Sequence, residues 1–358
     1  MPVFSKYLYK EFFKLLLLSL FAFIAIYIMV HFFGKVDNFI EARVPRAVII
    51  QYLLYLLPFI VVQMLPPAIL IAVIIMFSLM RKNNEIMALK ACGIKVFDFM
   101  SPVFVLGFLL SLTLFVFSES IVPYASARAN GLWRVYVEKK SGERTYGRDH
   151  IWYKSKNAIY WIARFDPGKN AMYGPTFYFF DPAFHLLKRI DGKVAVWKGH
   201  AWEVRNGITL TGDREGGYAL SRFKKIYLKI PEQPETFAQE ERQPEEMGYW
   251  QLKRFAEKVQ DEGYDASRYF VDLNIKLSFP FIVFIMVLLG APIALLQNRG
   301  GTPVSIAAGV VACFCYLVVL GLSRSLGLAG ILPPVLSAWL ANGIFFFLGS
   351  FLILKLDQ

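Results

Sequence analysis

Charged residues and cysteines are both scarce in this chain of 358 residues. Charged side chains make up 18% of it, whereas hydrophobic residues make up 56% and the mean hydropathy is +0.45. Soluble domains carry about a quarter charged residues, so this balance indicates a membrane protein. The three cysteines, Cys92, Cys313 and Cys315, offer no disulfide framework. We therefore expect every folded part to be held by apolar packing.

The sequence also lacks the common motifs of catalysis and nucleotide binding. It has no GxxxxGK(S/T) loop, no HExxH and no GxSxG. Its four histidines (His31, His150, His185 and His200) do not have the spacing of metal ligands on a helix. The apolar runs contain almost no ionisable residues, which argues against an ion-coupled carrier. We expect no catalytic residue, no metal and no bound cofactor.

Long uncharged runs occur six times, and each is long enough for a bilayer, which needs about 20 residues. They are Leu15–Gly34, Ala47–Met80, Phe99–Ser118, Leu277–Asn298, Gly300–Ser323 and Ser325–Leu354. Pro58, Pro66 and Pro67 predict a bend in the second. We divide the chain into residues 1–121 with three spans, 122–246 as an exported domain, 247–275 as a helical connector and 276–358 with three more spans.

Basic residues decide which end of the spans faces the cytoplasm. Nine lie on the side of the termini: Lys6, Lys10, Lys14, Arg81, Lys82, Lys90, Lys95, Arg299 and Lys355. Four lie in the opposite short loops: Lys35, Arg43, Arg46 and Arg324. The positive-inside rule therefore places the termini in the cytoplasm and the exported domain in the periplasm or outside the cell. Arg324 is interpreted as an interfacial anchor.

The exported domain shows the pattern of a β-structure from about Asp149. Eight short runs rich in β-branched and aromatic residues alternate with turn signals such as Asp191-Gly192 and Asn206-Gly207. They predict an antiparallel sandwich, jelly roll or open barrel. Its aromatic residues either fill a core or line a slot for lipid chains; they are Trp152, Tyr160, Trp161, Phe177, Phe179, Trp197 and Trp202.

A short capped helix is predicted at about residues 84–93, between the second and third spans. Asn83 and Asn84 suit its N-cap, Glu85 suits its first turn, and Gly93 suits a left-handed C-terminus. Ile86, Leu89 and Cys92 fall on one face. The helix is either a plain connector or a lever that another protein grips.

Lys35, Arg43 and Arg46 follow the first span on the side that the positive-inside rule disfavours. Positive charge there invites an anionic partner. The alternative is that these residues pair with Asp37 and Glu41.

Several motifs occur in a recognisable order. They are EIMALKACG at 85–93, GYWQL at 248–252, GYDA at 263–266, KLSFP at 276–280, and LPP at 332–334 before AWL at 338–340. Together they resemble the LptF/LptG permeases of the lipopolysaccharide export ABC transporter over essentially the whole chain. Val36-Asp37 and the LPP to AWL ending look more like LptG than LptF.

The resemblance implies a membrane α-helical fold of six transmembrane helices with an inserted periplasmic β-jellyroll-like domain, in the inner membrane of a Gram-negative bacterium. It implies a non-catalytic permease subunit that extracts lipopolysaccharide from the outer leaflet and passes it to a periplasmic bridge. The implied partners are an LptF-like permease, an LptB-like ATPase dimer that binds the ATP, and an LptC-like periplasmic protein. No nucleic-acid partner is expected.

The resemblance also implies roles for single residues. Glu85, Ile86, Leu89, Lys90 and Gly93 would couple the chain to the ATPase. Lys35 would contact lipid A phosphates, and Arg43 and Arg46 would supply the downstream charge, because Ile40 and Glu41 stand where lysines are expected. Trp161, Phe179 and Trp197 would line the lipid slot.

Three other functions are weighed against this one. The chain could be the LptF-like half of the same transporter, a mechanotransmitting ABC membrane subunit that moves no lipid, or a membrane-embedded enzyme. Six spans and the basic end of the first span argue against the second. The missing catalytic motifs argue against the third.

Overall fold

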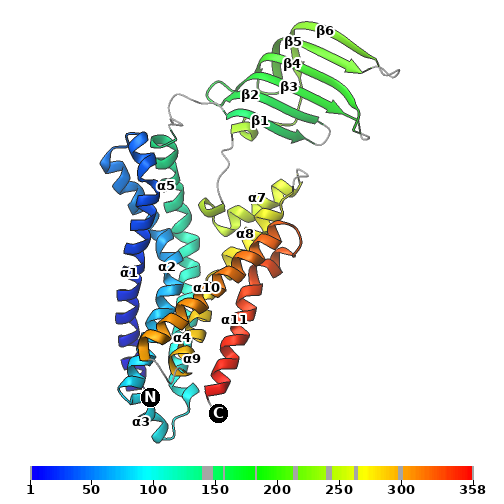
Figure 1. Ribbon diagram of the computed structural model, residues 1–358. Helices are drawn as coiled ribbons and strands as arrows, with labels where there is room; N and C mark the ends of the chain where they lie inside the picture. The colour runs from blue at the N-terminus through cyan, green and yellow to red at the C-terminus, as the bar shows by residue number, and fades with distance from the viewer. Residues whose placement is uncertain are drawn as a thin grey trace. The chain divides into compact units, whose positions relative to one another are not determined.

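The computed structural model describes residues 2–138, 148–155, 158–181, 184–212, 217–238, 244–261, 265–296 and 301–356 (Figure 1). The chain forms two compact units. The helical unit comprises Met1–Trp133, Gln243–Glu257 and Asp265–Gln358, and the sheet unit comprises Arg134–Arg242 and Lys258–Tyr264. We placed the exported domain from residue 122 onward, whereas helix α5 (Val122–Tyr136) lies largely within the helical unit.

Among the described residues, five helices are long and apolar enough to cross a bilayer. They are α1 (Pro2–Glu41), α2 (Arg46–Lys82), α4 (Val96–Ser120), α10 (Gly301–Leu328) and α11 (Pro334–Leu356). A sixth span is a bent pair, α8 (Ser267–Ser278) and α9 (Phe281–Leu296), which meet at 50°. The predicted six-span fold is thus confirmed with the pair counted as one span. The predicted start of the last span at Ser325 was wrong, because α10 continues to Leu328.

Pro280 interrupts the ladder of backbone hydrogen bonds at the bend between α8 and α9, because proline has no N–H. Side chains of neighbouring helices donate to carbonyls at this bend. Ser111 of α4 donates its hydroxyl to the Pro280 carbonyl at 2.8 Å, and Asn342 of α11 donates its amide to the Ser278 carbonyl at 2.8 Å. Asn342 accepts in turn from the hydroxyl of Tyr316 on α10 at 2.7 Å. Two carbonyls at the bend therefore have side-chain donors, which favours a broken helix in an apolar surrounding.

Helix α9 lies at the centre of the helical unit and is hydrophobic on every side. It packs against α2, α4, α10 and α11. Gly107 of α4 and Gly349 of α11 make this close packing possible, because a Cβ there would come within 2.8 Å of Val287 and 2.9 Å of Leu288. Small residues at such contacts let apolar helices approach closely.

The sheet unit contains one antiparallel sheet in the simple order β1-β2-β3-β4-β5-β6. Its strands are β1 (Arg148–Ser155), β2 (Ala158–Asp166), β3 (Ala171–Phe180), β4 (Leu186–Trp197), β5 (Trp202–Gly212) and β6 (Tyr218–Leu228). The short helix α6 (Pro234–Ala238) packs against β2. The expected open, jellyroll-like sheet is confirmed.

Six strands replace the eight that we predicted, because two turn signals lie inside strands. Asp191-Gly192 lies within β4 and Asn206-Gly207 within β5, where the two glycines are register partners. Asn206 has a φ of 51°, and a Cβ on Gly207 would come within 2.0 Å of the Asp191 carbonyl. The two dipeptides therefore do not form hairpin turns. They mark a bend that runs across β4 and β5, which we call the crease.

The crease changes which face each strand turns to the core. Met172 and Phe177 on β3, and Ile190 and Ala195 on β4, are all buried in one cluster although the members of each pair are five residues apart. A flat strand would place such pairs on opposite faces. The crease therefore bends the sheet around its aromatic core.

The opposite face of the sheet is charged. Glu203 on β5 accepts hydrogen bonds from Arg205 at 2.6 Å, Lys225 at 2.9 Å and Tyr227 at 3.0 Å. The Lys225 ammonium is the main reason that the pKa of Glu203 is lowered to about 2. The opposite face thus carries a network of charged and polar groups around Glu203.

Candidate functional site

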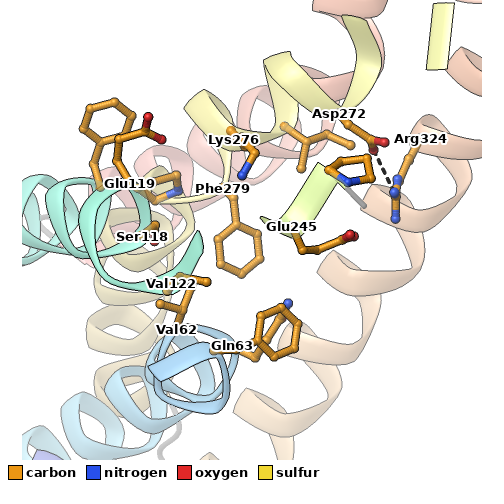
Figure 2. A pocket seen from close by; sticks show the side chains of 15 residues that line it. Val62, Gln63, Ser118, Glu119, Val122, Glu245, Asp272, Lys276, Phe279 and Arg324 are labelled. Carbon is orange, nitrogen blue, oxygen red and sulfur yellow. Dashed lines mark hydrogen bonds and ion pairs between the residues drawn. The ribbon is translucent and has the colours of Figure 1, made fainter. Parts of the chain in front are cut away.

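A small cavity lies at the bend between α8 and α9. Its volume is about 190 Å³, and its walls come from α2, α4, α8 and α10 together with the 3-10 turn η1 (Pro244–Glu246). Side chains one turn apart on α8, Asp272 and Lys276, project into it, followed by Phe279 (Figure 2). The bend gives these residues their place, because it turns the polar face of α8 toward α2 and α4.

An ion pair joins α8 to α10 beside this cavity. Arg324 donates to one carboxylate oxygen of Asp272 at 2.7 Å, as the dashed line in Figure 2 shows. The Asp272 side chain is 7% exposed and that of Arg324 is 44% exposed. The second oxygen of Asp272 is buried and has no hydrogen-bond partner among the described residues. Our interpretation of Arg324 as an interfacial anchor thus missed its partner.

Three carboxylates surround Lys276: Glu119, Glu245 and Asp272. Glu119 also accepts a hydrogen bond from the backbone N–H of Tyr249, the first residue of α7 (Tyr249–Asp261). In the described part of the chain no three His, Cys, Asp or Glu side chains are placed to hold a metal ion. The cavity has room for a few water molecules and is smaller than ordinary ligand pockets of about 300–1,000 Å³. Its charged groups, Glu119, Glu245, Asp272, Lys276 and Arg324, lie among apolar side chains from the surrounding helices.

Lys35 lies near the C-terminal end of α1 and turns inward. Its ammonium donates to the hydroxyl of Tyr52 on α2 at 3.0 Å and lies 4.0 Å from the ring centroid of Trp133 on α5. Within the described residues it forms no ion pair with Asp37 or Glu41. Arg43 and Arg46 are exposed at the turn between α1 and α2, and they likewise make no ion pair with those acids. The pairing alternative is therefore not observed among the described residues.

Helix α3 (Glu85–Ala91) lies at the end of the helical unit that also holds the start of α1 and the end of α11 (Figure 1). Gly93 has the predicted left-handed conformation, with a φ of 76°. The predicted asparagine cap was wrong, because Asn84 itself is left-handed and makes no side-chain cap. Instead Asn83 donates to the Glu85 carboxylate at 3.2 Å. The hydroxyl of Tyr7 on α1 donates to the same carboxylate at 3.3 Å.

The five predicted coupling residues point in different directions. Ile86 is buried, whereas Leu89 is half-buried against the same helical core and lines a pocket with Phe4, Ile94 and Phe99. Lys90 and Gly93 are exposed, and Glu85 is half-buried. Met87, which sequence reasoning did not select, is 70% exposed. The outward face of α3 therefore combines Met87 and Lys90, with Glu85 at its start.

The three predicted slot residues lie on two faces of the sheet. Phe179 and Trp197 are half-buried against the aromatic core. Trp161 lies between the core residues Tyr160 and Ile162, so strand alternation places it on the other face, near Trp152. Phe237 of α6 is fully buried on the core face and contacts the rings of Tyr153, Phe165 and Trp202.

Comparison with known protein families identifies the family of this chain. The family model described as "Lipopolysaccharide export system permease LptF/LptG" matches residues 6–355, which is nearly the whole chain. No curated protein matches the sequence.

The ion pair between Asp272 and Arg324 generates a stability prediction. Arg324→Gln leaves a buried carboxylate without its cation, and we expect a loss of about 1–3 kcal/mol because Arg324 itself is partly exposed. Thermal unfolding of the purified protein measures it. The double variant Asp272→Asn/Arg324→Gln is expected to recover most of the loss.

A matched control is the exposed pair Lys253 and Glu257, whose charged atoms are 3.8 Å apart. Glu257→Gln is expected to cost about 0.5 kcal/mol or less. An Arg324→Gln protein as stable as the Glu257→Gln protein would show that the pair does not join α8 to α10.

Proposed function

The chain belongs to the LptF/LptG family of lipopolysaccharide export permeases, and from this premise we propose that it is the LptG-like subunit of its transporter. The family consists of permease subunits of an ABC transporter, and its apolar helices make this chain a multi-pass protein of the inner membrane. Val36-Asp37 and the LPP to AWL ending support the LptG-like assignment over the LptF-like one. An LptF-like permease would then complete the membrane part.

The proposed orientation places α3 and both chain ends in the cytoplasm and the sheet unit in the periplasm. The excess of Lys and Arg around α3 and the termini supports it. In this orientation Lys35 lies at the level of the outer leaflet, where lipopolysaccharide resides.

The observation that carries the proposal for substrate capture is the Lys35 ammonium, which lies near the end of a long apolar helix and pairs with no carboxylate of the described residues. Lipid A carries phosphates, and charge-assisted hydrogen bonds from Lys35 would hold them. Arg43 and Arg46 are exposed near the same end of α1 and would add to the attraction. The chain would thus take up lipopolysaccharide by its headgroup.

We expect Lys35→Ala to weaken lipopolysaccharide capture by about one to two decades, because one charge-assisted bond contributes about 1.5–3 kcal/mol. Photocrosslinking of lipopolysaccharide to the reconstituted transporter at two salt concentrations measures capture. Arg43→Ala and Arg46→Ala should have smaller effects that fade at high salt, because both side chains are exposed. Unchanged crosslinking in the triple variant would contradict headgroup recognition at this end of α1.

The proposed energy source is a separate LptB-like ATPase dimer, which binds the ATP. The outward face of α3 supports this, because Met87 and Lys90 are exposed and Glu85 is held only by neutral donors. Phe179 and Trp197 would guide the lipid along the core face of the sheet toward an LptC-like protein, whereas Trp161 lies on the wrong face for that role.

We expect Glu85→Lys to separate ATP hydrolysis from lipopolysaccharide release, because the carboxylate would no longer be available to the ATPase. The measurement is ATPase activity and lipid release in the same proteoliposomes. Glu257→Lys makes the same charge change on the exposed face of α7 and is expected to leave both activities unchanged. Normal release from the Glu85→Lys transporter would remove α3 from the coupling path.

A further inference from the structure

We propose that Trp133 and Tyr52 are positioning residues for substrate capture, which hold the Lys35 ammonium oriented and unneutralised so that it can bind a phosphorylated lipid headgroup. The inference rests on the proposed role of Lys35 and adds two residues from α5 and α2. Neither residue was selected from the sequence, because residue 133 was assigned to the β-domain and Tyr52 lies within an apolar run.

The contacts form an aromatic box around one cation. The Lys35 ammonium lies 4.0 Å from the Trp133 ring centroid and 5.5 Å from the Tyr52 ring centroid, and it donates to the Tyr52 hydroxyl at 3.0 Å. A cation placed over an aromatic ring is attracted by the ring's negative face, and here that ring is Trp133. The ammonium lies at the hydroxyl edge of Tyr52, because it donates to that hydroxyl. Among the described residues, Lys35 therefore contacts one ring face and one hydroxyl and no carboxylate.

The box itself is well supported. Phe39 and Tyr52 are each 4% exposed. Phe39 packs edge-on against Trp133 with centroids 5.5 Å apart, and Tyr52 and Trp133 are 5.7 Å apart. His31 lies 3.1 Å from the Tyr52 hydroxyl, which is thus hydrogen-bonded on two sides. These contacts hold both rings in place independently of Lys35.

The chemistry of the box favours an anionic ligand. A carboxylate partner would neutralise the ammonium and compete with a phosphate. A ring face stabilises the positive charge without occupying an N–H group, and Tyr52 accepts only one of the three that an ammonium offers. The remaining donors stay available to phosphate oxygens. The box therefore stops the lysine side chain from extending toward water while leaving its charge free to act.

The test combines two readouts on the reconstituted transporter. The first is the labelling rate of Lys35 by an amine-reactive reagent, followed by mass spectrometry. The second is lipopolysaccharide photocrosslinking. For Trp133→Leu we expect Lys35 labelling to rise at least about threefold and capture to fall about threefold to tenfold, from the strength of a partly desolvated cation–π contact. Trp133→Phe, which keeps a ring in the box, should be intermediate in both.

Trp250→Leu is the matched control, because Trp250 is exposed and lies 5.8 Å from another ammonium, that of Lys253. It should change neither Lys35 labelling nor capture. Added lipopolysaccharide should protect Lys35 from labelling, whereas inorganic phosphate at the same concentration should not. Protection by phosphate alone would overturn the lipid assignment.

Two further outcomes would overturn the inference. Unchanged Lys35 labelling in both Trp133 variants would show that the rings do not hold the ammonium. Raised labelling with unchanged capture would show that the box only packs the lysine stem. A failure of the underlying proposal, that Lys35 binds the headgroup, would give a different result. Lipopolysaccharide crosslinking would then be normal in Lys35→Ala, while the Trp133 variants would still show raised labelling of Lys35.

Discussion

The bend between α8 and α9 is the constraint on which the helical unit depends. Pro280 interrupts the helix beside the buried helix α9, and Ser111 and Asn342 donate to carbonyls at the bend. Such side-chain donors lower the cost of a broken span in an apolar surrounding. With the helix broken there, α9 fills the centre while Asp272 and Lys276 of α8 line a cavity. The position of the ion pair between Asp272 and Arg324 is thus a consequence of the bend between α8 and α9.

Helix α1 connects the two regions that the proposed function requires. Its 40 residues extend about 60 Å at 1.5 Å per residue. Near its start Tyr7 contacts Glu85 of α3, and near its end Lys35 enters the aromatic box of α2 and α5. One continuous helix therefore contacts α3, which is proposed to meet the ATPase, and carries the cation that is proposed to meet the lipid.

The sequence predicted the spans and the β-structure because hydropathy and strand alternation are local signals. The sequence-based prediction failed where a feature depends on contacts between segments that are distant in the sequence. Asn206-Gly207 predicts a hairpin turn, but it lies inside β5, where the strand is bent. The box at Lys35 and the pair of Asp272 with Arg324 join distant segments, which no spacing reveals. Gly93 was predicted correctly because a left-handed C-terminus is a property of one residue.

Movement of lipopolysaccharide across this chain is the central claim, and site-specific photocrosslinking in the sheet unit tests it most directly. A photoreactive residue at Trp197, on the core face, is compared with one at Trp161, on the opposite face, in transporter supplied with its ATPase. The account predicts lipopolysaccharide adducts at Trp197 that require ATP, and none at Trp161. Adducts absent from Trp197 while ATP is being hydrolysed, or equal at both positions, would contradict it.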